Sequence, residues 1–126
     1  MARVLLIEPD KVLAASCEKI FLNNGFDVDL CDDAQDGIDK IDKNIPNLII
    51  MEVQLANHNG VEFLYELRSY PEWKNIPVII LSMVPYQDMN ISYLKNNLGI
   101  IEYYYKPKTQ LDKLVKSARS IIDENN

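Results

Sequence analysis

The 126-residue chain contains few of the residues that carry covalent, metal or redox chemistry. It has two cysteines, Cys17 and Cys31, which form no CxxC pair, and a single histidine, His58. We therefore expect neither a disulfide nor a Cys/His metal site, and we predict that both thiols are free and buried. Because His58 has no second histidine or cysteine near it in the sequence, a solvated loop residue is a simpler interpretation than a metal ligand.

Glycine and long apolar runs are also scarce. The chain has four glycines, and the segment after the first apolar run reads PDKVLA instead of a glycine-rich phosphate loop, which argues against a nucleotide or flavin site. No apolar run is long enough to cross a bilayer, and the start of the chain lacks the charged and apolar regions of a signal peptide. We expect a cytoplasmic protein that does not act on a membrane.

Basic residues are outnumbered, with 13 Lys and Arg against 19 Asp and Glu and a net charge of -6. Direct binding of nucleic acid is not expected, because neutralising phosphates takes clustered cations. Positive charge nevertheless gathers in the last quarter of the chain. Its members are Lys106, Lys108, Lys113, Lys116 and Arg119. This group is either a solvated helix face or a docking surface for an acidic partner, and the sequence leaves both open.

Continuous apolar runs alternate with segments of helical period along the whole chain. The clearest runs are VLLI at 4–7, LIIM at 48–51 and VIIL at 78–81, and strands covered on both faces have this composition. Amphipathic spacing predicts helices over about 13–21, 34–41, 61–70, 86–98 and 111–122. We therefore predict one α/β domain over residues 1–126, with a five-stranded parallel sheet and helices on both faces.

Residues at the predicted helix ends have the chemistry of caps. Asp10 precedes the first helix, and either Asp32 or Asp33 precedes the second. Thr109 is the candidate cap of the last helix, and Gly25 is a plausible stop for the first. These positions set the expected boundaries of the elements.

Polar side chains follow four of the predicted strands. Glu8 comes after the first strand, Glu52 after the third, Ser82 after the fourth and Lys106 after the fifth. The carboxyl ends of parallel strands meet at one edge of a sheet, where such folds bind ligands. Two acids, a hydroxyl and an ammonium at that edge form a polar cluster that a purely structural core would not need.

The order and spacing of these motifs resemble the receiver domain of two-component response regulators, over the whole chain. The motifs are VLLIEPD, PNLIIMEVQL followed by Asn59-Gly60, IPVIILS and GIIEYYYKP. The resemblance implies a flavodoxin-like, doubly wound (βα)5 fold with strand order 2-1-3-4-5. It also implies a protein partner from a signalling pathway, such as a histidine kinase or an output protein.

The resemblance assigns expected roles to the polar cluster. In receivers, an acidic pair after the first strand holds Mg²⁺, and an aspartate after the third strand accepts a phosphoryl group. Glu8 matches the first acid of the pair, and Glu52 stands at the phosphoacceptor position. Ser82 and Lys106 match the residues that bind the phosphoryl oxygens. Tyr103 matches the aromatic residue that reports the switched state.

Two positions depart from the family pattern. Pro9 stands where the second acid should be, and Glu52 carries its carboxylate one methylene further out than an aspartate does. Mg²⁺ requires near-octahedral oxygen geometry, so a site with Glu8, Glu52 and a backbone carbonyl near Gln54 should bind it poorly. Asp10 could supply a ligand, but capping the first helix is the simpler role for it. We therefore expect no cofactor.

These departures favour an atypical receiver, a pseudo-receiver, that is not an enzyme. It would act through protein–protein interaction, independently of aspartyl phosphorylation, with Glu52 reaching toward Lys106 and Ser82 into the space of a phosphoryl group. The alternative is an active phosphoacceptor that uses Glu52 with a Mg²⁺ ion held by Glu8 and Asp10. A small-molecule binder built on the same sheet is a third hypothesis.

The resemblance also predicts geometry. Lys106 should contact Glu52 or Glu8 in a closed ionic cluster. The bond between Lys106 and Pro107 should be cis, as the family's Lys-Pro bond is, because X-Pro bonds adopt cis at small cost.

The C-terminal part of the chain is the expected partner surface, since receivers use the fourth helix, fifth strand and fifth helix for output. The candidate contacts are Met89, Tyr105, Lys108, Lys113 and Lys116. Strand alternation should place Tyr103 and Tyr105 on one face and Tyr104 on the other. Nothing in the sequence specifies the oligomeric state.

Overall fold

Strands and helices alternate in the computed structural model, which describes residues 1–56 and 59–125. The strands are β1 (Arg3–Ile7), β2 (Asp27–Cys31), β3 (Leu48–Met51), β4 (Val78–Ser82) and β5 (Ile100–Tyr105). The α-helices are α1 (Lys11–Asn23), α2 (Ala34–Lys43), α3 (Gly60–Ser69), α4 (Ile91–Leu98) and α5 (Leu111–Glu124). Two short 3₁₀ turns are η1 (Tyr86–Asp88) and η2 (Lys106–Lys108). The prediction for His58 concerns a residue outside the described ranges.

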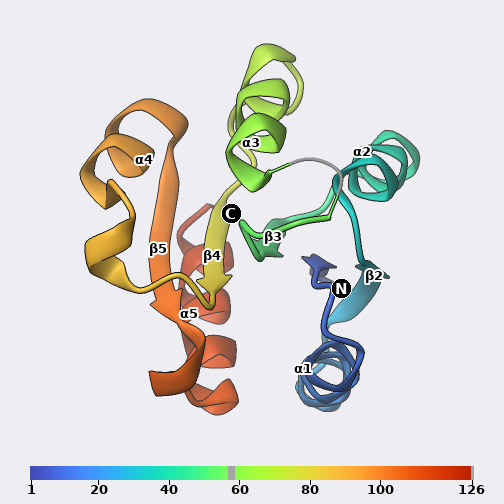
Figure 1. Cartoon of the computed structure of the whole chain (residues 1–126). Coiled ribbons are helices and arrows are strands. Elements are labelled where there is room, and N and C mark those ends of the chain that lie inside the picture. The colour runs from blue at the N-terminus through green and yellow to red at the C-terminus, as the bar shows by residue number, and fades with distance from the viewer. Residues whose placement is uncertain (57–58, 126) are drawn as a thin grey trace.

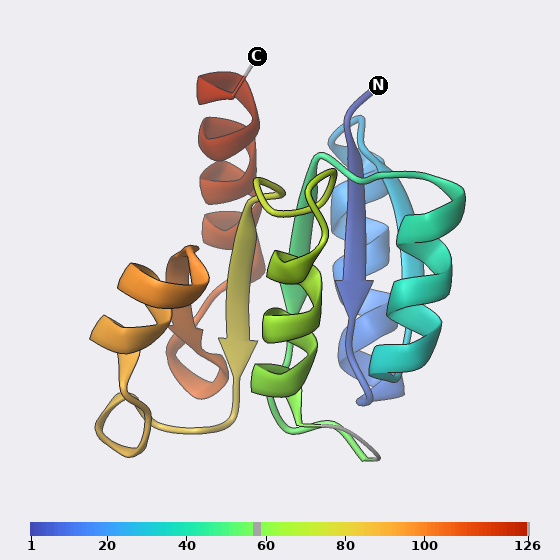
Figure 2. The same ribbon diagram turned by 90° about the horizontal axis from the view of Figure 1, so that it is seen from above.

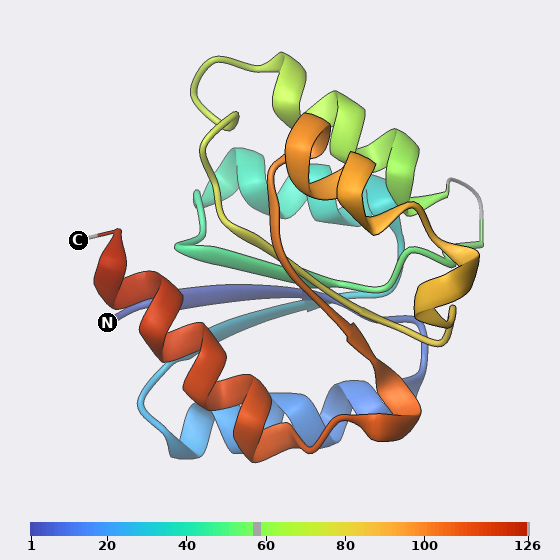
Figure 3. The ribbon, with the colours of Figure 1, turned by 90° about the vertical axis from the view of Figure 1, so that its left-hand side faces the viewer.

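The five strands form one parallel sheet in the order β2-β1-β3-β4-β5, which confirms the predicted doubly wound topology. Helices α1 and α5 cover one face, and α2, α3 and α4 cover the other (Figures 1 and 3). Successive residues of β1 alternate between the two layers. Leu5 and Ile7 join the core beneath α2–α4, whereas Val4 and Leu6 join the core beneath α1 and α5. A strand buried on both faces therefore has a continuous apolar sequence.

Side-chain caps fix where the first two helices begin. The carboxylate of Asp10 accepts hydrogen bonds from the N–H groups of Val12 (3.0 Å) and Leu13 (3.1 Å) at the start of α1. Asp33, one of the two predicted candidates, caps α2 through the N–H of Asp36 (2.8 Å). Both caps satisfy helix donors that have no intrahelical partner.

Two predicted helix starts are wrong. The fourth helix was expected from residue 86, but η1 ends at residue 88 and α4 begins at 91, where Asn90 caps it through the N–H of Tyr93. Thr109 does not cap α5. Its hydroxyl donates instead to the backbone oxygen of Tyr105 (2.8 Å), and α5 begins after Gln110 without a side-chain cap.

The predicted cis bond before Pro107 is also wrong, since no peptide bond between described residues is cis. The chain passes from β5 directly into η2, whose first turn contains Pro107. There the N–H of Thr109 donates to the backbone oxygen of Lys106 (3.2 Å). A trans bond is compatible with this turn because proline has no N–H to satisfy and its fixed φ suits a helical first turn.

The carboxyl ends of the strands share one edge of the molecule, and both termini lie at the opposite edge (Figure 2). This common edge is where the four polar residues of the strand ends were expected to meet. Within the described ranges, no helix has the length and apolarity that a bilayer crossing requires.

Gly60 holds the segment after β3 against α3. Its N–H donates to the backbone oxygen of Val53 (2.7 Å), and a Cβ at position 60 would lie 2.6 Å from the Cα of Val53. Gly60→Ala should therefore push backbone apart and lower the free energy of unfolding by about 1–3 kcal/mol, measured by urea denaturation.

Gly37→Ala is the matched control. A Cβ there would lie 2.9 Å from Cδ1 of Ile7, the movable end of a side chain, and alanine favours the helix by roughly 1 kcal/mol. A Gly60→Ala variant as stable as Gly37→Ala would show that the segment after β3 tolerates displacement.

Candidate functional site

The four polar side chains predicted at the strand ends come together at one edge of the sheet. Nζ of Lys106 lies 2.8 Å from Oε1 of Glu52 and 2.9 Å from Oε1 of Glu8, which confirms the predicted contact. Glu8 and Glu52 are each 2% exposed and Ser82 is fully buried. One ammonium group is therefore shared by two buried carboxylates.

The carboxylate of Glu52 accepts hydrogen bonds on both oxygens. The donors to Oε2 come from the segment after β3 and from the end of β4, and those to Oε1 come from the β4 loop and the end of β5. They are the N–H groups of Val53 (2.7 Å) and Gln54 (3.1 Å) with the hydroxyl of Ser82 on Oε2, and the N–H of Met83 (3.0 Å) with Nζ of Lys106 (2.8 Å) on Oε1. Five donors from three strand ends thus converge on one side chain.

These contacts give the two carboxyl groups different pKa values. Burial raises the pKa of Glu52, but hydrogen bonds from Lys106, Ser82 and two backbone N–H groups outweigh burial and hold the pKa below its usual 4.5. For Glu8, burial outweighs the hydrogen bond from Lys106, and the pKa rises above 4.5. Burial lowers the pKa of Lys106, but its hydrogen bonds to both carboxylates raise it above 10.5. The ionised form of Glu52 is thus the form that the site stabilises.

The residues around this cluster do not fit a magnesium ion. Oε2 of Glu8 accepts bonds from Lys106 (3.0 Å) and from the N–H of Asp10 (3.1 Å), and Asp10 uses its own carboxylate to cap α1. Pro9 has no side-chain oxygen, and both oxygens of Glu52 already accept donors. In the described ranges, no group of three or more His, Cys, Asp or Glu residues is placed to hold a metal. An octahedral oxygen shell would require these carboxylates to release their present donors.

A short chain of contacts connects the cluster to the aromatic residue of β5. The N–H of Val84 donates to the hydroxyl oxygen of Ser82 (3.0 Å), and the hydroxyl of Tyr103 donates to the backbone oxygen of Val84 (2.7 Å). Tyr103 is 5% exposed, and burial raises its pKa. The ring centre of Tyr86 lies 5.7 Å from the ring centre of Tyr103 and 6.2 Å from that of Tyr105. As predicted, Tyr103 and Tyr105 therefore face the same side of β5.

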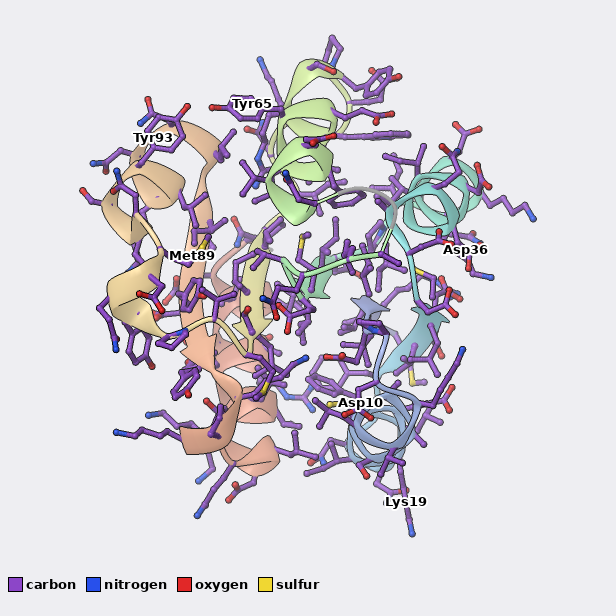
Figure 4. The ribbon with its side chains drawn as sticks, viewed as in Figure 1. Asp10, Lys19, Asp36, Tyr65, Met89 and Tyr93 are labelled. Carbon is purple, nitrogen blue, oxygen red and sulfur yellow. The ribbon has the colours of Figure 1, made fainter. Side chains whose placement is uncertain are left out.

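The predicted partner surface is divided by β5. Met89 and Tyr105 lie on the α4 side, where Met89 packs against the core and its side chain is marked in Figure 4. Lys113 and Lys116 lie on α5 and line a groove of about 430 Å³ along β5, and Lys108 is exposed in η2. The five candidates therefore belong to two neighbouring surfaces.

Sequence reasoning missed several residues of these surfaces. Tyr104 and Ile101 lie in the groove along α5, with Nζ of Lys113 at 5.9 Å from the Tyr104 ring centre and Ile101 42% exposed. Alternation along a regular strand would place residues 101 and 104 on opposite faces, so it gave no signal for Ile101. The pairing of β4 with β5 is irregular between Val78 and Ile79, and Ile101 is the extra residue there. No sequence signal pointed to Tyr86, or to the N–H of Met83 as a donor to the cluster.

Comparison with known proteins shows similarity to one family along most of the chain. The model of the response regulator receiver domain matches residues 4–119. Response regulator MprA from Mycobacterium sp. (strain KMS) is 24% identical over 95% of this chain and 50% of that protein. Response regulator ArlR from Staphylococcus aureus (strain Mu50 / ATCC 700699) is 27% identical over 97% and 53%. The chain spans about half the length of the curated relatives it matches.

Solved structures show the same similarity in three dimensions. The receiver domain of the Francisella response regulator 1452 superposes with a TM-score of 0.88 and 26% identity over the full length of both chains. A receiver domain protein (CheY-like) from Methanospirillum hungatei JF-1 superposes with a TM-score of 0.86 and 22% identity, over 98% of this chain and 95% of that one.

The unequal environments of the two glutamates can be measured directly. In a carboxyl ¹³C NMR titration, Glu8 should show a midpoint above 4.5 and Glu52 a midpoint below it. Lys106→Met removes the shared ammonium and should raise both midpoints. If Glu52 titrates above Glu8, the donors do not hold Glu52 in its ionised form.

The direction of the Glu52 shift also determines its effect on stability. Its folded-state pKa lies below its unfolded value, so its contribution to the free energy of unfolding is present above pH 4.5 and is lost as the pH falls through the folded pKa. Glu52→Gln should reduce the loss of stability in acid. Glu66→Gln, which removes an exposed carboxylate on α3, serves as the control.

Proposed function

Because this chain belongs to the response regulator receiver domain family, we propose that it is an atypical member that signals through protein–protein interaction, independently of aspartyl phosphorylation. The observation that carries the proposal is the saturated carboxylate of Glu52, which accepts five donors within the polar cluster. In an ordinary receiver, groups at these strand ends serve a phosphoryl group. Here the side chain of Glu52 accepts hydrogen bonds from these groups.

Positioning and charge both argue against phosphoryl transfer to Glu52. An attacking carboxylate oxygen must approach phosphorus in line, whereas both oxygens of Glu52 are turned toward Ser82, Met83 and Lys106. Without a fitting metal site, the anionic donor and the anionic acceptor would repel each other in a partly desolvated pocket. A glutamate carries one negative charge where a phosphoryl group carries about 1.5 to 2, so Glu52 is a partial mimic of a phosphorylated residue.

We place the partner on the surface along β5 and α5. The groove there combines the apolar side chains of Ile101 and Tyr104 with four charged residues. These are Lys113, Lys116, Glu102 and Glu124. The two glutamates balance the two lysines within the groove, so the positive charge that favours a partner with an acidic face depends on the exposed Lys108, just before α5. The partner would be a cytoplasmic protein of a signalling pathway, such as a histidine kinase or an output protein.

A series of variants separates the two obstacles to phosphorylation. Incubated with acetyl phosphate and Mg²⁺, the unmodified protein and Glu52→Asp should both gain no phosphoryl mass, because Pro9 still leaves the metal short of a ligand. The double variant Pro9→Asp/Glu52→Asp should gain the adduct, and adding Lys106→Ala should remove it again. Intact-protein mass spectrometry measures each outcome.

The control for this series is the folded state of each variant, since Pro9 restricts the unfolded chain just before α1 and its replacement lowers stability. Circular dichroism before and after incubation monitors the fold. An adduct on the unmodified protein that maps to Glu52 would overturn the proposal in favour of an active phosphoacceptor that uses Glu52, Glu8 and Asp10 with Mg²⁺.

The docking proposal has its own test. Lys113→Glu/Lys116→Glu should slow association with a native partner, and added salt should weaken the difference, because rim charges act mainly on the rate of encounter. The measurement compares the proteins captured from native lysate by the immobilised variant and by the unmodified protein.

Lys19→Glu/Lys43→Glu makes the same change in net charge on exposed positions of α1 and α2 and is the matched control. If both double variants capture the same proteins in the same amounts as the unmodified protein, the partner does not dock along β5 and α5.

A further inference from the structure

Arg68, near the end of α3, is a charged side chain whose partners in the described part of the chain are all backbone groups. Its guanidinium is partly buried, and no carboxylate among the described residues forms an ion pair with it. It donates instead to five backbone oxygens. These belong to Trp73 (3.3 Å), Lys74 (3.0 Å), Ile76 (2.8 Å), Leu98 (2.9 Å) and Gly99 (3.4 Å). Burial of a guanidinium without a counter-ion lowers the pKa of Arg68.

The five acceptors come from two separate segments. Three lie in the connection between α3 and β4, and two lie where α4 ends and β5 begins. The last carbonyl groups of a helix have no intrahelical partner and carry partial negative charge, so a cation placed there is stabilising. The planar guanidinium reaches both segments at once because its donors point in several fixed directions.

Gly99 closes α4 at the point where Arg68 binds. It adopts φ 65°, a left-handed conformation that closes α4, and its N–H donates to the backbone oxygen of Leu94. A Cβ at this position would lie 3.5 Å from Nη2 of Arg68. That distance is an ordinary van der Waals contact, so glycine is required here by the left-handed backbone and not by the space beside Arg68.

A second contact joins the same two helices. The hydroxyl groups of Tyr65 on α3 and Tyr93 on α4 are hydrogen-bonded, and Figure 4 shows the two side chains pointing toward each other. Both rings are partly exposed, at 49% and 39%, so this contact lies at the surface. The partly buried bond from Arg68 to the backbone oxygen of Leu98 is the better protected link between α3 and α4.

The loop that leads from β4 to α4 is hydrogen-bonded to the polar cluster and to β5. The N–H of Met83 donates to Glu52, and the backbone oxygen of Val84 accepts from Tyr103. We infer that Arg68 is a fixed anchor for the C-terminal end of α4, and that it holds Leu98 and Gly99 in place whatever the state of the Glu52 cluster. A change at the cluster would then move residues 83–90 and the first turn of α4, and α4 would swing about its anchored C-terminal end.

This anchor does not rest on the proposed function, because Arg68 contacts no residue of the polar cluster. Amide hydrogen exchange measured by NMR tests it in the whole chain. Arg68→Met keeps much of the side-chain volume and removes all five hydrogen bonds. Hydrogen bonds to a charged group are strong enough that exchange at residues 98–100 should speed up about tenfold relative to the amides of β1, which report global unfolding.

Arg119→Met is the matched control, because Arg119 also donates to a backbone oxygen, that of Asn24, and stacks on Phe26. It should leave exchange at residues 98–100 unchanged relative to β1. For Arg68→Lys, the exchange rate at residues 98–100 should lie between the rates of the unmodified protein and Arg68→Met, since an ammonium cannot reach both segments. Glu52→Gln should speed exchange at Met83 and Val84 but not at residues 98–100.

Two results would overturn the inference. In the first, Arg68→Met speeds exchange equally at β1 and at residues 98–100, which would mean that Arg68 contributes only to global stability. In the second, Glu52→Gln speeds exchange at residues 98–100 as much as Arg68→Met does, which would mean that the polar cluster holds this end of α4.

Discussion

The ionised carboxylate of Glu52 is the group on which the arrangement of the strand ends depends. A buried charge is tolerated only when it is paired and hydrogen-bonded, and Glu52 obtains both from Lys106, Ser82 and three backbone N–H groups. These donors come from three strands that are far apart in the sequence. The same side chain therefore aligns the ends of β3, β4 and β5. Removing one of these groups would leave other buried groups without a hydrogen-bond partner, so the interactions of the cluster are cooperative.

Much of the fold could be predicted because parallel strands buried on both faces have a distinctive apolar composition. VLLI, LIIM and VIIL became β1, β3 and β4 with only small changes at their ends. The meeting of Glu8, Glu52, Ser82 and Lys106 followed from topology, since parallel strands end at one edge. Features decided by tertiary packing were not predictable: the late start of α4, the isomer of the bond before Pro107, and the five backbone partners of Arg68. Backbone donors and acceptors are the same at every position, so no residue type marks them in a sequence.

A small number of contacts connect the polar cluster to the α4 side of β5. Ser82 touches Glu52 on one side and Val84 on the other, and Val84 accepts from Tyr103 of β5. This path leads to the α4 side of β5, where Tyr86 packs against two tyrosine rings. The groove with Lys113 and Lys116 lies on the other side of β5 and shares no hydrogen bond with the cluster in the described part of the chain. A partner that docks in this groove would meet a surface whose shape is set by β5 and α5 themselves.

The number of donors on Glu52 has a consequence for how this sequence can change. An aspartate at position 52 would be one methylene shorter, so its carboxylate would lie closer to the backbone and could not occupy the position from which Glu52 makes its five bonds. A single step from glutamate to aspartate would therefore leave buried donors unpaired before any new chemistry became available. An acid in place of Pro9 alone would add a third carboxylate around one ammonium. Either substitution alone would thus disturb the charges and donors around Lys106, so the effects of substitutions at positions 9 and 52 should not be additive.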